Sequence, residues 1–389
     1  MHRRRMRSEK YIALASCLFF LLITNQVARA GGPQHSQTNS PAAQQAAKPA
    51  PEPAQPSDAP SIHVDSAGLD PLTGIPYYKE IREDWSSLQV GSSELKPEPP
   101  VVTLPDEEDT FTRTLVALKW RPGDALDVYV ILPKGVKKPP AVLYLYNYSD
   151  DTDRFKNDGW CRRVTVGGVA AIGFVSALSG QRFHDRPMKQ WFVSELQESL
   201  GSTVHDVKFI LDYLASRGDL DMDRIGMFGQ GSGATIALLA SAADSKIKAV
   251  DALDPWGDWP VWLAKSVVEA DDPDRERHLK PEFLERVAPL DPVQWLPKVQ
   301  APYLRIQQNM EETATPRDSK DKIKAAAPPR TIFERYDTTA AFMNQAGRGM
   351  LFDWIKDAVD KPAASPASKN AAVASGSSAE AAAKSPVQR

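Results

Sequence analysis

Two kinds of hydrophobic pattern alternate along the middle of this chain. Short continuous apolar runs are typical of strands buried on both faces, whereas apolar residues spaced three and four apart predict helices with one buried face. The runs predict strands at residues 141–146, 169–175, 224–229, 249–253, 303–306 and 331–336. The spaced residues predict helices at residues 153–164, 203–216, 232–243 and 340–359.

A different pattern precedes these elements. Residues 111–120 and 126–132 alternate apolar and polar side chains on either side of the turn Arg121-Pro122-Gly123-Asp124, which predicts an antiparallel hairpin at one edge of a sheet. Because strands and helices then alternate, we expect an α/β fold with a mostly parallel central sheet and helices on both faces. Ligands of such sheets bind at the carboxyl ends of the strands.

The first thirty residues have the layout of a secretory signal peptide. An arginine-rich start is followed by an apolar run from Tyr11 to Thr24, 14 residues long, and then by Ala28-Arg29-Ala30. A membrane-spanning helix needs roughly 20 apolar residues. Leu14 to Cys17 resemble a lipoprotein cleavage box, but apolar residues continue past Cys17, which favours cleavage after Ala30. We therefore predict a secreted or periplasmic protein with no stable membrane span after the signal (residues 1–30) is removed.

Two further segments lack the apolar side chains that a packed core requires. Residues 31–70 are rich in Pro, Ala and Gln, and residues 362–389 are rich in Ala, Ser and Lys. Such compositions predict disorder, because little burial offsets the entropy of ordering the chain. Residues 71–361 remain, which is enough for one large α/β domain.

Charge, cysteine content and the acidic residues argue against a nucleic acid partner, a disulfide and a metal site. The 47 basic and 50 acidic residues give a net charge of −3, so we expect no nucleic acid partner. Removal of the signal leaves Cys161 as the remaining cysteine, so no disulfide can form within the chain. We predict neither a cofactor nor a metal site, because Asp150, Asp151 and Asp153 lack the glycine and distal glutamate of a calcium loop.

The motif with the most chemical information lies in residues 219–234, which predict a strand, a sharp turn and a helix. These residues resemble the α/β-hydrolase superfamily, especially its dienelactone hydrolase, acetyl-xylan esterase and prolyl-oligopeptidase-like branches. In that family a Gly-x-Ser-x-Gly turn presents the nucleophilic serine. The matching residues are Gly229, Gln230, Gly231, Ser232 and Gly233. The resemblance implies an α/β-hydrolase fold in which glycine has replaced the nucleophile, and glycine removes the strain that the turn imposes on a side chain.

The resemblance also gives expected positions for the other two members of a catalytic triad. Relatives carry a histidine shortly before a phenylalanine after the last strand, and aligning on Phe342 puts Ala340 at that position. Glu311 or Glu312 follows the strand at residues 303–306 and matches the acidic member. A triad carboxylate orients a histidine, so without one a solvated loop glutamate is the favoured interpretation. Two of the three catalytic positions are therefore predicted to be lost.

A second interpretation keeps catalysis. Ser232 would then be the nucleophile, with His184, which adjoins Asp185 in a loop, as a displaced base. The alternative for His184 is a hydrogen bond that caps its loop. His205 is expected at the start of an amphipathic helix, where helix packing and compensation of the helix dipole explain its presence better than catalysis does.

The candidate pocket residues follow the ends of predicted strands. Asn147 and Tyr148 lie where relatives supply an oxyanion-hole amide, and Tyr148 is expected to crowd that space. Gln230 adjoins the turn, and Trp256 and Trp259 either line a ligand cleft, stack on sugar rings or form a lid that packs on its own core.

Three functions follow from these alternatives, and the sequence leaves open whether the protein is an enzyme. It is a non-catalytic hydrolase relative with a ligand pocket, an active serine esterase, acyl hydrolase or peptidase, or a protein that binds carbohydrate or cell-envelope material. The expected ligand is a small molecule, an ester or a carbohydrate.

Overall fold

The computed structural model describes residues 82–121, 124–147, 152–177, 196–270, 275–348 and 350–361. These residues belong to one compact unit, Glu80–Arg389. The predicted signal peptide, the leader at residues 31–70 and the tail at residues 362–389 lie outside them. None of the helices in these ranges combines the length and apolar character that crossing a membrane requires.

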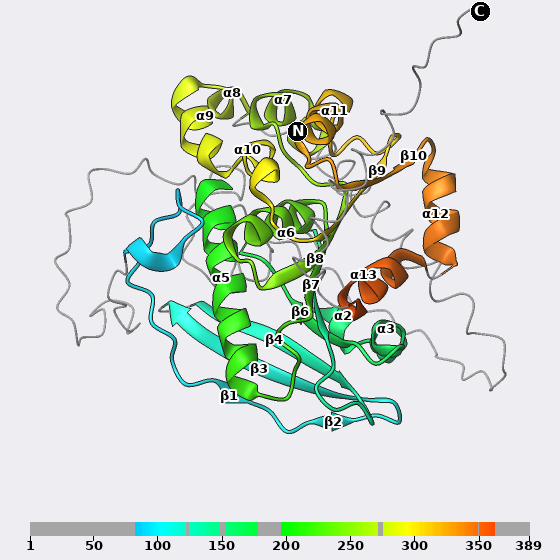
Figure 1. Cartoon of the computed structure of the whole chain (residues 1–389). Coiled ribbons are helices and arrows are strands. Elements are labelled where there is room, and N and C mark those ends of the chain that lie inside the picture. The colour runs from blue at the N-terminus through cyan, green and yellow to red at the C-terminus, as the bar shows by residue number, and fades with distance from the viewer. Residues whose placement is uncertain are drawn as a thin grey trace, which may run out of the picture. The chain divides into compact units, whose positions relative to one another are not determined.

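The described residues form one ten-stranded sheet, shown in Figure 1. Its order is β1-β3-β4-β6-β5-β7-β8-β9-β10, and β2 also pairs with β3. The strands are β1 (Val101–Val102), β2 (Asp106–Glu107), β3 (Phe111–Arg121), β4 (Asp124–Pro133), β5 (Ala141–Leu145), β6 (Ala170–Phe174), β7 (Ile225–Gln230), β8 (Ile247–Leu253), β9 (Tyr303–Asn309) and β10 (Ile332–Tyr336). From β6 to β10 neighbouring strands are parallel, and β3 and β4 form the antiparallel hairpin. The predicted α/β class and mostly parallel sheet are confirmed.

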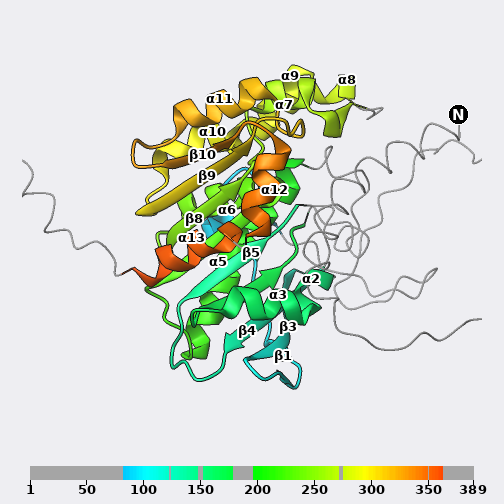
Figure 2. The same cartoon turned by 90° about the vertical axis from the view of Figure 1, so that its right-hand side faces the viewer.

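Helices cover both faces of the sheet. α5 (Leu196–Arg217) and α6 (Ser232–Ala243) lie on one face, and α3 (Asp158–Thr165) and α13 (Met350–Asp360) lie on the other (Figures 1 and 2). The apolar side chains of α5 and α6 and those of the sheet form the main core. The remaining helices are α2 (Asp153–Lys156), α7 (Trp259–Lys265), α8 (Arg275–His278), α9 (Pro281–Val287), α10 (Pro292–Trp295), α11 (Arg317–Ala326) and α12 (Thr339–Gly347), with single 3-10 turns at Val90–Ser92 (η1), Val267–Glu269, Ala288–Leu290 and Leu296–Lys298.

Three helix predictions need correction. The helix predicted at residues 153–164 is two helices, because the side chain of Asn157 accepts a hydrogen bond from Trp160 N and starts α3 as a new helix. The helix predicted at residues 340–359 is also divided, since α12 ends before Arg348. The helix predicted at residues 203–216 begins earlier, at Leu196. Thr203 lies inside this helix and donates to the carbonyl oxygen of Ser199 at 2.7 Å.

A buried cluster of charges joins the start of the described chain to α5 and the hairpin. Arg121 makes two hydrogen bonds of 2.6 Å to the carboxylate of Glu83 and one of 2.5 Å to Asp206. His205 Nδ1 lies 2.7 Å from Glu83 Oε1, and His205 Nε2 lies 2.9 Å from the carbonyl oxygen of Ser87. His205 was expected at the start of a helix, but it lies inside α5 and binds this N-terminal segment instead.

The environment of Glu83 shifts its acidity strongly. Burial alone would raise the pKa of Glu83, but the hydrogen bonds from Arg121 and His205 outweigh this effect and lower the pKa from 4.5 to about 2. A carboxylate whose pKa is depressed in the folded state stabilises that state above its unfolded pKa, and the stabilisation is lost as the pH falls through the folded pKa. Glu83 therefore stabilises the fold above pH 4.5 and stops doing so toward pH 2.

We predict that Glu83 is responsible for a distinct part of the acid sensitivity of this fold. In the unchanged protein its contribution to the free energy of unfolding, about 3 kcal/mol, is lost between about pH 4.5 and pH 2. Glu83→Gln removes one partner of a buried ion pair and should destabilise the protein by about 3–5 kcal/mol at neutral pH. Urea unfolding at a series of pH values measures both effects. The exposed Glu94→Gln is the matched control, and an equal acid sensitivity in Glu83→Gln and Glu94→Gln contradicts the prediction.

Candidate functional site

The turn between β7 and α6 has a backbone conformation that side chains rarely adopt. Gly231 lies at its apex with φ 56° and ψ −119°, and its N–H donates to the carbonyl oxygen of Leu253 at 2.9 Å. The neighbouring glycines are needed for close packing, because a Cβ at Gly233 would overlap the carbonyl oxygen of Leu145, and one at Gly229 would overlap that of Gly233. The turn thus keeps the backbone of a nucleophile elbow and has no side chain at its apex.

The sheet topology brings this apex beside the end of another strand. β5 and β7 are parallel neighbours, but β5 connects to β6 on one side and β7 connects to β8 on the other. Such a reversal of strand order opens a crevice at the carboxyl ends of the two strands, where ligands of α/β proteins bind. Asn147 follows β5 and Gly231 follows β7, so both lie at this point.

The carboxamide of Asn147 fills the space at the apex. Its Oδ1 accepts a hydrogen bond from Ser232 Oγ at 3.1 Å and a longer one from Ser232 N at 3.4 Å. A Cβ added at Gly231 would lie 2.9 Å from Asn147 Oδ1 and 3.2 Å from its Cγ. The sequence pointed to Tyr148 as the crowding residue, but Tyr148 lies outside the described residues. The signal that identifies Asn147 is its place directly after a buried strand beside the switch in strand order.

Ser232, the alternative nucleophile, is the first residue of α6. Its side chain is fully buried and donates to Asn147. A serine nucleophile has to meet its substrate and a base, so burial against an amide oxygen does not favour that role. His184, the base proposed for it, lies outside the described residues.

The loops expected to supply the acid and the histidine are in contact with each other. Glu311 Oε2 accepts a hydrogen bond of 2.7 Å from the backbone N–H of Thr339, the residue before Ala340. Asn309 Nδ2 donates to Thr339 Oγ1 at 3.0 Å. Glu312 instead accepts from two amides of its own loop. The structure therefore brings Glu311 to the loop of Ala340, where its carboxylate accepts from the first backbone N–H of α12.

Two ionisable side chains next to the loop of Glu311 and Glu312 had not been identified from the sequence. Asp254, which has a φ of 47°, accepts a hydrogen bond of 2.9 Å from Asn309 N. Lys320 is buried and donates to the carbonyl oxygens of Asn309 and Glu312, both at 2.5 Å. Burial raises the pKa of Asp254 from 3.8 to about 7, although the charge of Lys320 opposes the shift, and burial lowers the pKa of Lys320. The positive φ of Asp254 and the distant contact of Lys320 leave no sequence pattern that would have revealed this pair.

The candidate tryptophans belong to the core. Trp256 and Trp259 are each 1% exposed, and their ring centroids lie 4.7 Å and 5.7 Å from that of Trp262. Neither ring presents a face on which a sugar could stack, and the arrangement agrees with the lid interpretation. Trp256 Nε1 nevertheless lies 3.5 Å from where a Cβ at Gly231 would be, so this indole also borders the apex, while Gln230 is half-buried at the end of β7.

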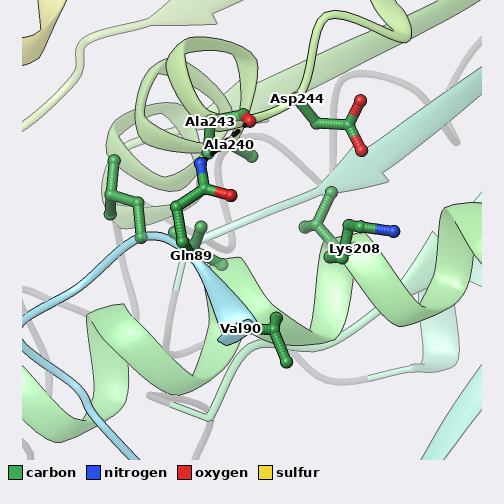
Figure 3. Close-up of a pocket in the computed structure, with 9 residues that line it drawn as sticks. Gln89, Val90, Lys208, Ala240, Ala243 and Asp244 are labelled. Carbon is green, nitrogen blue, oxygen red and sulfur yellow. Dashed lines mark hydrogen bonds between the residues drawn. The ribbon is translucent and has the colours of Figure 1, made fainter. Parts of the chain in front are cut away.

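A pocket in the described residues lies elsewhere. It encloses about 40 Å³ between η1, α5 and the C-terminal end of α6, and Gln89, Val90, Lys208, Ala240, Ala243 and Asp244 are among its lining residues (Figure 3). Gln89 Nε2 donates to the carbonyl oxygen of Ala243 at 3.2 Å. Since the elbow lies at the opposite end of α6, this pocket has no part in the candidate site.

Comparisons with known proteins agree with the fold. No protein-family profile matches the sequence. A Bacillus subtilis (strain 168) protein named "Putative hydrolase YtaP" is 27% identical over an alignment of 159 residues, and the match covers 37% of this chain and 52% of that protein. The chain thus spans about half the length of this curated relative.

Two solved structures cover more of the chain. The acetyl xylan esterase from Paenibacillus sp. R4 matches with a TM-score of 0.51 and 17% identity, over 71% of this chain and 96% of the esterase. Acetyl xylan esterase 1 from Thermoanaerobacterium sp. JW/SL YS485 matches with a TM-score of 0.50 and 15% identity, over 66% of this chain and 88% of the esterase. At these identities the likeness establishes the fold.

We predict that Asp254 destabilises the fold at neutral and alkaline pH. An acid whose pKa is raised in the folded state favours folding below its unfolded pKa of 3.8, and that contribution is lost as the pH rises to about 7. Asp254→Asn keeps an oxygen acceptor for Asn309 N and should therefore raise the free energy of unfolding at pH 8 more than at pH 4. Urea unfolding at the two pH values measures this difference, and the exposed Asp223→Asn serves as a surface control. A larger gain at pH 4 than at pH 8 contradicts the prediction.

Proposed function

We propose that this protein, which has the α/β-hydrolase fold, is a non-catalytic member of that fold class that retains a small-molecule site at its elbow. The observation that carries the proposal is Gly231, which has the backbone conformation of a nucleophile and no side chain. A serine in this conformation stores strain that is useful only for catalysis. Glycine adopts it without that cost.

The neighbouring positions support the same conclusion. Ala340 stands where the resemblance expects the general base, and Glu311 hydrogen-bonds to the backbone beside it. Hydrolysis by a serine nucleophile needs that serine, a general base and an open oxyanion site together. The carboxamide of Asn147 lies between the apex of the elbow and the first amide of α6. The residues at three positions, Gly231, Ala340 and Asn147, are therefore consistent with an elbow that does not catalyse hydrolysis.

An active hydrolase that uses Ser232 is the second candidate. The solved structures with this fold include two acetyl xylan esterases, which makes a small ester the natural substrate to test. The burial of Ser232 and its hydrogen bond to Asn147 argue against it.

We predict that the purified protein is not labelled by a fluorophosphonate probe and does not hydrolyse p-nitrophenyl acetate above the buffer rate, since labelling needs an activated serine and ester turnover needs an activated nucleophile. Gly231→Ser/Ala340→His should gain turnover at least about tenfold above the parent, because general-base catalysis alone contributes about 10² or more. Gly231→Ser with Ala340 unchanged is the matched control. Labelling of the parent that disappears in Ser232→Ala would overturn the proposal and establish the second candidate.

We also propose that the protein is exported. The basic start, short apolar run and Ala28-Arg29-Ala30 of residues 1–30 support this localisation.

Expression of the whole chain in a bacterium with two membranes should yield a protein that begins at Gly31 in the periplasmic fraction or the medium. Intact-mass spectrometry measures its N-terminus. Ala30→Arg, which spoils the small-residue pattern, should block cleavage, and a cytoplasmic product that begins at Met1 in the unchanged chain contradicts the proposal.

A further inference from the structure

The N-terminus of α6 provides hydrogen-bond donors for an oxygen atom. The first amides of a helix have no acceptor inside the helix, and the helix dipole makes this end favourable for an electron-rich oxygen. In an active hydrolase the amide after the nucleophile binds the carbonyl oxygen of the substrate. Here that amide belongs to Ser232, and both its N–H and its hydroxyl donate to Asn147 Oδ1.

The same carboxamide also lies against the space that a side chain at the apex would occupy, so a side chain at position 231 requires Asn147 to shift. Its oxygen lies 2.9 Å from a Cβ at Gly231, closer than real Cβ atoms approach other atoms, and Trp256 Nε1 borders the same space at 3.5 Å. One planar group therefore takes the volume of both a nucleophile and the oxygen of a substrate. Asn147 itself is half-buried.

We propose that Asn147 is an internal ligand of the elbow, in which its carboxamide stands in for the acyl group of a substrate. The groups that compete with it for the donors of Ser232 are small amides and carboxylates, because both present a planar oxygen acceptor of this size. In the parent such a ligand has to displace the Asn147 side chain, and in a variant with a shortened side chain the donors of Ser232 are free to bind it directly. This proposal deepens the proposed function and rests on its assignment of Gly231 to the nucleophile position.

A double-mutant cycle tests the steric part. Gly231→Ala adds backbone strain whether or not Asn147 is present, but it adds a clash only where Asn147 is present. We expect Gly231→Ala to increase the unfolding equilibrium constant about tenfold more in the parent than in the Asn147→Gly background, as is typical of residues in contact. Equal increases in the two backgrounds would overturn the proposal.

Chemical rescue tests the ligand part. Asn147→Gly removes a group with the composition of acetamide, so molar acetamide should raise the Tm of this variant by about 2–4 °C relative to the parent, roughly the effect of one regained hydrogen-bonded contact. Asn344→Gly is the matched control, because Asn344 is exposed on α12 and its loss leaves no enclosed space. Sodium acetate replaces acetamide in a second series. A response of Asn147→Gly to neither compound beyond that of Asn344→Gly would overturn the proposal.

A third pair of variants distinguishes the oxygen acceptor from general packing. Asn147→Asp keeps the acceptor and adds a charge that the N-terminus of α6 favours, so its Tm should equal or exceed that of the parent. Asn147→Leu has a similar size and no acceptor, and its Tm should fall. A Tm of Asn147→Leu that equals the Tm of Asn147→Asp would overturn the proposal. Because these readouts measure folding, they stand whether or not the protein is labelled by a fluorophosphonate.

Discussion

The close approach of α6 to the end of β5 is the constraint on which the candidate site depends. The first turn of the helix packs so tightly on the carbonyl groups of Leu145 and Tyr146 that position 233 has no room for a Cβ. This contact sets the direction of α6, directs its first amides toward the carboxyl ends of the strands, and brings the residue after β5 against the apex of the turn. The geometry is a property of the backbone, so it does not depend on which side chain stands at position 231.

The contacts that maintain the fold are separate from the residues at the apex of the turn. The α/β-hydrolase fold is maintained by the apolar faces of the sheet and by the helices on both sides, and none of those contacts requires a catalytic serine or histidine. Gly231 relieves strain at the apex, Glu311 satisfies an amide of α12, and Asn147 satisfies an amide of α6. Two of these polar contacts, those of Glu311 and Asn147, therefore join the ends of strands to the first turns of helices.

The sequence predicts much of the fold because the buried strands are continuous apolar runs and α6 occupies the predicted residues 232–243. Helix boundaries were less predictable where polar side chains decided them, as at Asn157, which starts a new helix, and at Thr203, which bonds within α5. The elbow itself was identifiable from the spacing of Gly229, Gly231 and Gly233. The role of Asn147 was not, because it depends on which strands are neighbours in space. Asp254 and Lys320 are far apart in sequence and meet only through the packing of α11 against the loop that follows β9.

The ion pair between Glu83 and Arg121 also anchors the start of the described chain to the rest of the fold. Two residues beyond the pairing of Ser87 with His205, the same segment reaches α6, where Gln89 donates to the carbonyl oxygen of Ala243 at the end of the helix opposite the elbow. A pull on the chain before residue 82 is therefore resisted first by Glu83, Arg121 and His205. Only after those bonds break does the load reach the helix whose other end forms the candidate site.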